Sequence, residues 1–415
     1  MNKSFYLLFA LYPIFHAHGE TGTMPLTLNS AIEMGLKNNP ELTSSAAKIR
    51  ASNGRFWSAI SPPPAEVSTT NDYVPTGQSL NRFGEKTVGV NQSIEFPTNY
   101  FVRGSKFKKE AEISRQEYSQ AGLTVTAKIK SSYFKALALQ EQITIAHENV
   151  EIADHFVKKA EIRYSVGEAT NLEKLTAKAQ YTQALNELDV NKNHLIAAYA
   201  DLNYALGFGK HEKKEFELVD SLKIPPCNVP LDTLINDAAC NNPQIKINKL
   251  REEAYAAEKK LAWSGFLPGI TIGVFSKKVR GDTQDYYGAS AGITIPLWFM
   301  LDQHGKIKEA SANLISAQSD SRSMENSVYL AAQHAYTEFM NAEKQVVLYQ
   351  KELLPQTEEI YRAASKSYEA GEITYIEFLQ AQQTLINSRG GYIDALLSYN
   401  LSIVAIEESI GKTLR

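Results

Sequence analysis

The chain has almost no cysteine: two thiols, Cys227 and Cys240, in 415 residues. Two cysteines are too few to form a structural zinc site by themselves. In an oxidising compartment they could pair across the short loop between them, or both could remain thiols, and the sequence leaves both readings open. The histidines are scattered, and His147 and His155 have no third ligand nearby in the sequence. We therefore expect no metal site and no cofactor.

A charge excess of one sign is also missing. Lys and Arg number 43 and Asp and Glu 46, which gives a net charge of −3. This balance excludes the basic excess expected of a protein that binds nucleic acid. The segment 207–210 lacks the spacing of a phosphate-binding loop, and no Gly-x-Ser-x-Gly nucleophile motif occurs. We therefore expect that the protein is not an enzyme.

Long hydrophobic runs are missing too. After residue 19 the sequence has no run of about 18 apolar residues, the length that predicts a membrane-spanning helix. A shorter apolar run, 5–15, follows Lys3 and precedes the small residues of 17–19. This order predicts a signal peptide over 1–19, and the alternative is a buried N-terminal helix. Because no cysteine lies directly after the run, lipid attachment there is not expected.

What the chain does have is an internal repeat. Asn38-Asn39-Pro40 returns about 204 residues later as Asn241-Asn242-Pro243. Four further landmarks recur in the same order at nearly the same offset: Trp57-Ser58 and Trp263-Ser264, Gly89 to Pro97 and Gly288 to Pro296, Tyr164 to Glu168 and Tyr368 to Glu372, and Leu206-Gly207 and Ile410-Gly411. The pattern predicts a tandem duplication, with repeats at 20–223 and 224–415.

Each repeat begins with two helical segments separated by Asn-Asn-Pro. The proline disfavours the helical conformation at the asparagine before it, so the first helix should end there. A pair of strand candidates follows, about 66–96 in the first repeat and about 269–295 in the second. In 87–96 and 287–295, apolar residues alternate with small or polar ones. Such strands fit a membrane barrel with lipid on one side and water on the other. They fit a soluble hairpin with one face on a core equally well.

Each repeat ends in a long helical hairpin, about 99–207 and about 303–411. The segment 99–164 contains no proline, and some 60 helical residues would span roughly 90 Å. Pro355 predicts a kink in the second hairpin. Glycine-centred turns at Gly167 and Gly371 reverse the chain between the two arms.

Four strands are too few to close a barrel, and hydrocarbon does not tolerate open sheet edges. If the strands lie in a membrane, several chains must therefore contribute to one barrel. Two chains would give eight strands and three would give twelve, and both are allowed numbers. The strands alone do not choose between them.

With these motifs the chain resembles the TolC family of outer-membrane efflux proteins over nearly its whole mature length. The resemblance is carried by the duplicated Asn-Asn-Pro, the strand pairs ending at Pro97 and Pro296, and the turn segments 165–181 and 370–382. It implies a mainly α fold with a small β part, in a homotrimer. Three chains would form a twelve-stranded β-barrel in the outer membrane and a long helical barrel in the periplasm. The length and the absence of a lipid-anchor cysteine are similar to the heavy-metal, CzcC-type branch.

The resemblance also implies roles for the hairpin tips. The residues that would contact a periplasmic adaptor are Val166, Gly167, Glu168, Ala370, Gly371 and Glu372. Glu173 and Glu377 would form carboxylate rings at the tunnel entrance, and Tyr368 matches a gate position. The alternative is that both glutamates only favour a helix start. Because a basic position of the family is Ile373 here and an acidic one is Gln380, we expect a looser gate than the family's charged network.

Two functions follow from these observations. The favoured one is a passive outer-membrane exit duct of a tripartite efflux system. It would receive substrate, heavy-metal cations among the candidates, from an inner-membrane pump of the RND type through the adaptor. The alternative is a periplasmic coiled-coil scaffold or adaptor without a membrane barrel. A scaffold would need stricter heptads and no strands facing lipid.

Overall fold

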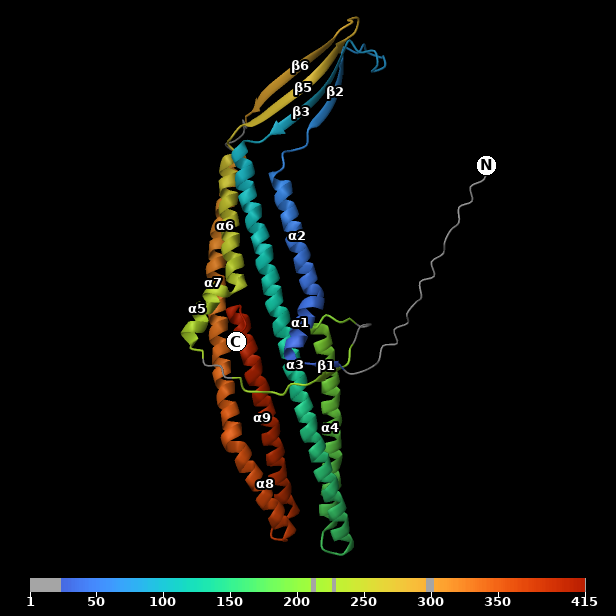
Figure 1. Cartoon of the computed structure of the whole chain (residues 1–415), viewed down its shortest axis with the longest axis vertical. Coiled ribbons are helices and arrows are strands. Elements are labelled where there is room, and N and C mark those ends of the chain that lie inside the picture. Colours follow the sequence, from blue (N-terminus) through green and yellow to red (C-terminus); the bar gives the residue numbers. More distant parts are fainter. Residues whose placement is uncertain (1–23, 210–213, 226–228, 296–301, 415) are drawn as a thin grey trace, which may run out of the picture.

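The computed structural model describes residues 24–209, 214–225, 229–295 and 302–414. The molecule is elongated, with a β-sheet at one end, two helical hairpins ending at the other, and short helices around the middle (Figure 1). The expected signal peptide over 1–19, Cys227 and Pro296 lie outside the described residues. Cys240 is exposed, and its pairing with Cys227 stays a prediction.

The expected strand pairs form one antiparallel sheet in which the two repeats lie side by side. Its strands, in spatial order, are β2 (Glu66–Asp72), β3 (Glu85–Ile94), β5 (Gly269–Val279) and β6 (Asp285–Thr294). The central β3–β5 pair joins the first repeat to the second, from Glu85 opposite Val279 to Ile94 opposite Ile270. β2 and β6 are the edges of the sheet. An open edge is a template for pairing with another chain.

Alternation along the strands gives the sheet two unlike faces, as the patterns in 87–96 and 287–295 predicted. One face carries exposed apolar side chains, namely Val67, Val88, Val90, Ile270, Ile272, Val274, Tyr287 and Ile293. The register places Val90 between Val67 and Val274 on this face. The other face carries small and polar residues such as Gly89, Asn91 and Gly273. A contiguous exposed apolar surface marks contact with lipid or with another protein.

The first hairpin consists of α3 (Pro97–Ser165) and α4 (Asn171–Ala205). α3 has 69 residues, and at about 1.5 Å per residue it is roughly 100 Å long. Pro97 lies in its first turn, where the missing amide hydrogen costs no helical hydrogen bond. Small residues such as Ala136, Ala146 and Ala153 are buried along α3, so the neighbouring helices pack closely.

The second hairpin has an interrupted first arm. α7 (Asp302–Leu348) is followed by a π-helical turn (Tyr349–Leu353) and α8 (Leu354–Glu369), and α9 (Tyr375–Ile410) returns. Pro355 lies in the first turn of α8. Because proline donates no hydrogen bond to the preceding turn, the α-helical ladder breaks there, and the π turn absorbs the mismatch. This interruption of the α-helix lies where Pro355 predicted a kink.

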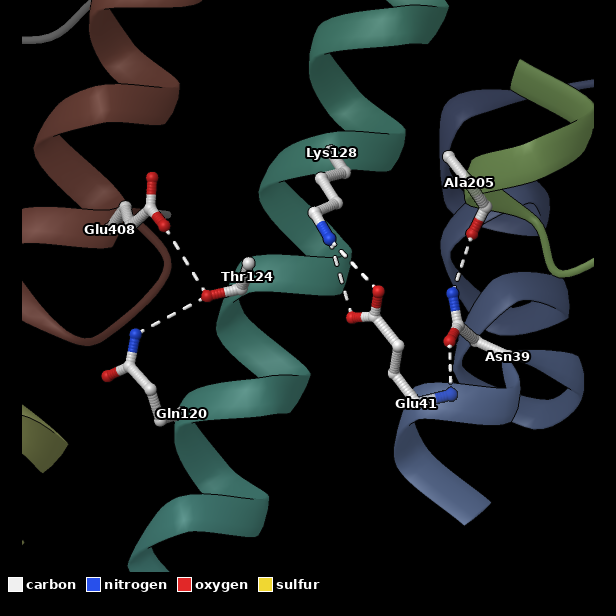
Figure 2. A network of polar contacts seen from close by, with 7 residues as sticks. All are labelled: Asn39, Glu41, Gln120, Thr124, Lys128, Ala205 and Glu408. Atoms are coloured by element: carbon white, nitrogen blue, oxygen red, sulfur yellow. Dashed lines mark hydrogen bonds and ion pairs between the residues drawn. The ribbon is translucent and has the colours of Figure 1, made fainter. Parts of the chain in front are cut away.

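Asn-Asn-Pro has the same structural role in both repeats. It separates α1 (Leu28–Asn38) from α2 (Pro40–Ile60) and α5 (Leu231–Asn241) from α6 (Pro243–Ser264). The Asn39 side chain accepts from the Glu41 amide at 2.8 Å and donates to the Ala205 carbonyl at 3.1 Å (Figure 2). Asn242 likewise caps α6 and donates to the Ser409 carbonyl at 2.8 Å. Each asparagine thus fastens a helix start to the end of the hairpin's return arm.

The glycine at the end of each return arm is required by this contact. Gly207 and Gly411 have φ angles of +87° and +75°, a region that disfavours other residues. A Cβ at Gly207 would lie 2.8 Å from the Cα of Asn39, and one at Gly411 would lie 2.7 Å from the Cα of Asn242. Asn-Asn-Pro and the glycine at the end of the return arm therefore recur together in the two repeats because they are in contact.

A two-stranded parallel sheet at the middle of the molecule was not predicted. β1 (Met24–Leu26) pairs with β4 (Phe216–Leu218). Leu26 is fully buried beside Tyr133, whose hydroxyl lies 2.8 Å from the Leu26 carbonyl and 2.7 Å from the Asp220 carboxylate. Strands of three residues are too short to show a period of two, so the sequence held no signal for them.

The two hairpins also contact each other near the middle of the molecule. Lys130 of α3 forms an ion pair with Glu407 of α9 at 2.5 Å, and the side chains are 13% and 8% exposed. Glu407 also accepts from the Leu414 amide at 2.9 Å. Beside this pair, Thr124 of α3 donates to the exposed Glu408 at 3.5 Å (Figure 2). A buried ion pair therefore joins the first repeat to the second.

Candidate functional site at the hairpin tips

The two hairpin tips are built alike. Gly167 and Gly371 adopt φ angles of +84° and +76° and end the outgoing helices. In the first tip Glu168 N donates to Arg163 O at 2.8 Å. In the second tip Glu372 N donates to Ser367 O, also at 2.8 Å. These bonds satisfy carbonyls at the helix end in the Schellman arrangement, which favours glycine at the reversal.

The tip residues expected to contact a partner are all exposed. Val166 is 65% exposed although it is apolar. Gly167, Glu168, Ala370, Gly371 and Glu372 are exposed as well. Each tip therefore offers backbone, one apolar side chain and one carboxylate at the end of the molecule opposite the sheet (Figure 1).

Glu377 mainly caps its own helix. Its carboxylate accepts from the Thr374 amide at 2.7 Å and from the Thr374 hydroxyl at 2.9 Å, and its amide donates back to that hydroxyl. These hydrogen bonds hold the pKa of Glu377 below its usual value. The capping box satisfies donors that a helix start leaves open. This is the local role that the sequence offered as the alternative to a carboxylate ring.

Glu173 occupies the equivalent position in the first repeat but faces the other hairpin. Its carboxylate accepts from the Tyr368 hydroxyl at 2.8 Å and lies 3.5 Å from the Arg163 guanidinium. Arg163 also donates to the Tyr368 hydroxyl at 3.1 Å. Glu173 and Arg163 are 17% and 28% exposed at the side chain. The three residues therefore form a compact polar triangle that joins the first hairpin to the second.

The triangle lies on an aromatic cluster. Tyr368 is 4% exposed, and its ring stacks on Phe378 with ring centres 5.4 Å apart. Phe156 of α3 contacts Phe378 at 4.3 Å and Tyr375 at 6.1 Å. Burial, followed by the hydrogen bond to Glu173, raises the pKa of Tyr368 to about 12. The hydroxyl is therefore protonated at neutral pH and stays a donor to the carboxylate.

Of the three residues that the sequence predicted to form the tunnel constriction, the structure brings only two into contact. Glu173 and Tyr368 are in contact, whereas Glu377 is engaged by Thr374. Sequence reasoning missed Arg163 and expected a looser contact, because Ile373 and Gln380 lack charge. Within one chain the cation of this contact comes from α3 and not from the second tip, and the looser gate stays a prediction. The available signal was that Arg163 and Glu173 lie close on either side of the turn at Gly167.

Other chemistry finds no support in the part of the chain that the structure describes. No three side chains among its His, Cys, Asp and Glu residues are placed to hold a metal ion. None of the helices seen there is both long enough and apolar enough to cross a membrane.

Comparison with known proteins gives a consistent result. The model of the family described as "Outer membrane efflux protein" matches residues 31–208 and 234–412, one segment in each repeat. The chain is 22% identical to the cobalt-zinc-cadmium resistance protein CzcC of Cupriavidus metallidurans, covering 94% of this chain and 90% of that protein. It is 21% identical to the outer membrane protein TolC of Escherichia coli, covering 90% and 80%.

Solved structures show the same fold. The outer membrane protein VceC of Vibrio cholerae superposes with a TM-score of 0.80 at 19% identity, covering 94% of this chain and 97% of that one. CusC superposes with a TM-score of 0.79 at 16% identity, covering 96% of both chains. The predicted fold class, a tandem repeat of long helical hairpins with a small sheet, is confirmed.

Proposed function

Because this chain belongs to the outer membrane efflux protein family, whose model matches both of its repeats, we propose that it is the exit duct of a tripartite efflux system. The protein is an outer-membrane efflux channel with a large periplasmic helical part, and it is not an enzyme. Within the proposed system it conducts passively, and an inner-membrane pump supplies the energy. The periplasmic scaffold that the sequence left open has no supporting observation.

The observation that supports this proposal is that the four-stranded sheet is open at both edges. Its apolar face is exposed, and its edges β2 and β6 are unpaired in a single chain. Three copies close twelve strands when β6 of each chain pairs with β2 of the next, which leaves no edge in hydrocarbon. The small and polar face then lines a water-filled lumen, and the helical hairpins continue the tunnel into the periplasm.

The hairpin tips carry the proposed gate and the proposed docking site. The triangle of Arg163, Glu173 and Tyr368 holds the two hairpins of one chain together in the closed state. Opening separates the hairpins and exchanges these contacts for water. The six exposed tip residues meet a periplasmic adaptor, which links the duct to a pump of the RND type. The exposure of both tips supports this placement.

We assign heavy-metal cations as the substrate class. The support is the relative named for cobalt, zinc and cadmium resistance, which aligns over 388 residues. A second relative is named for pyoverdine export, so the assignment needs a direct test.

Deletion of the gene is expected to lower the tolerated concentration of zinc, cobalt or cadmium severalfold, while tolerance of organic drugs is unchanged. The reason is that an exit duct limits whichever pump it serves. The measurement is growth inhibition with complementation by the full chain, and a variant with the exposed tip residues Val166 and Ala370 both replaced by aspartate, which keeps the two turn glycines, serves as a docking-deficient control. Drug sensitivity or lost siderophore export without metal sensitivity would reject the metal assignment.

A further inference from the structure

A row of charged residues crosses the sheet at the end of its apolar face. Going from β2 to β6, the register places Asn71 opposite Lys86, Lys86 opposite Lys278, and Lys278 opposite Asp285. Lys86 and Lys278 alternate in phase with Val88 and Val274, so they belong to the apolar face and not to the polar one. The exposed Arg280 follows just beyond β5, where its amide donates to Gly84 O at 2.8 Å.

The two lysines face each other without a counter-charge in contact. Like charges directly opposite in an antiparallel pair repel. In the described part of the chain, neither Lys86 nor Lys278 nor Arg280 has a carboxylate within 4 Å, although Asp285 is the cross-strand neighbour of Lys278. Lys277 differs, because it forms an ion pair with Glu85 on the polar face. The cations on the apolar face therefore lack the partner that the cation on the lumen side has.

The place of this row in the sheet identifies the missing partner. The loops beside it lie at the far end of the molecule from the helical hairpins (Figure 1). Because the helices are periplasmic, this end reaches the outer leaflet. The next row inward contains Val88, Ser276 and the 83% exposed Tyr287, and exposed tyrosines are typical of the interface between hydrocarbon and headgroups. The row lies on the central strands β3 and β5, so a neighbouring chain pairing at β2 or β6 does not cover it.

We propose that Lys86, Lys278 and Arg280 form a binding site for the phosphate groups of outer-leaflet lipid headgroups, with one site on each chain of the trimer. Three cations, none of them within 4 Å of a carboxylate in the described residues, attract a phosphate, while the apolar face below contacts the acyl chains. The lipid removes the repulsion between the two lysines and fixes the depth of the barrel in the membrane.

Native mass spectrometry of the full-length, detergent-solubilised trimer tests this site with diphosphorylated lipid A as the probe. The wild type is expected to bind up to three lipids per trimer, more weakly as salt is raised. Lys86→Gln with Lys278→Gln is expected to weaken binding by about tenfold or more. Lys277→Gln is the matched control from the polar face and is expected to bind as the wild type does.

Three results would overturn the proposal. They are equal binding by the double glutamine variant, equal binding of the dephosphorylated glycolipid, and displacement of the lipid by an excess of inorganic phosphate, which would indicate a general anion site. Lys86→Arg with Lys278→Arg keeps both charges and is expected to bind normally. If that variant also fails while its trimer is intact, charge is not the basis of recognition.

Discussion

Tyr368→Phe combined with Glu173→Gln is expected to raise the open fraction of the channel by about 10- to 100-fold, measured as single-channel conductance and open time in a planar bilayer. The tyrosine hydroxyl is 2.8 Å from the Glu173 carboxylate, and the two changes remove that hydrogen bond and the charge facing Arg163. Hydrogen bonds to charged groups contribute roughly 1.5–3 kcal/mol each. A loss of that size from the closed state alone shifts the equilibrium by one to two powers of ten.

Glu377→Gln is the matched control for this experiment. Glu377 is the repeat equivalent of Glu173, but its carboxylate accepts from Thr374 within the same tip. Its replacement is therefore expected to leave conductance and open time unchanged. If Glu377→Gln opens the channel as strongly as the double variant, the carboxylate rings and not the triangle control the entrance. Unchanged currents in the double variant would remove the triangle from the gate altogether.

Glu407→Ala is expected to destabilise the trimer by about 3–5 kcal/mol, because it leaves Lys130 as an unpaired buried cation. The Lys130–Glu407 pair is 2.5 Å long and joins the first hairpin to the second. Removal of Glu407 also leaves the Leu414 amide without the acceptor that it has at 2.9 Å. The measurement is the shift of the denaturant or thermal midpoint of the detergent-solubilised trimer.

Two further variants test whether the loss of stability comes from leaving Lys130 without a counter-charge or from shortening a glutamate side chain. Glu408→Ala removes the adjacent, exposed carboxylate and is expected to change stability by less than about 0.5 kcal/mol. Lys130→Met with Glu407→Met replaces both ions by apolar side chains and is expected to recover most of the loss, since no charge is then left unpaired. A double variant as unstable as Glu407→Ala would mean that loss of the acceptor for the Leu414 amide, and not the unpaired charge, causes the effect.

The repeat made most of the fold predictable. Asn-Asn-Pro, the alternating strands and the glycine turns each have a local physical cause, and seeing each of them twice removed much of the ambiguity of a single motif. The length of α3 followed from the absence of proline between residues 99 and 164. In the second hairpin, the presence of Pro355 marked the position at which the regular α-helix is interrupted. The sheet order that joins β3 to β5 required the fold, because it pairs residues of different repeats.

The candidate site was only half predictable, because its chemistry depends on contacts between the hairpins. Glu173 and Glu377 are equivalent in the sequence and each lies in the first turn of a capped helix. Only the packing of α9 against α3 brings Tyr368, at the end of α8, to Glu173 and leaves Glu377 with Thr374. Arg163 carried no motif of its own. Its role arises from a tertiary contact, which periodicity does not encode.

The most direct test of the central claim is the state and conductance of the purified mature chain. We predict that it runs as a trimer in detergent and forms cation-conducting channels in a planar bilayer, with low open probability in the wild type. A monomer or dimer that produces no channels would contradict the account, because the apolar face and open edges of the sheet would then have to be covered without a membrane barrel.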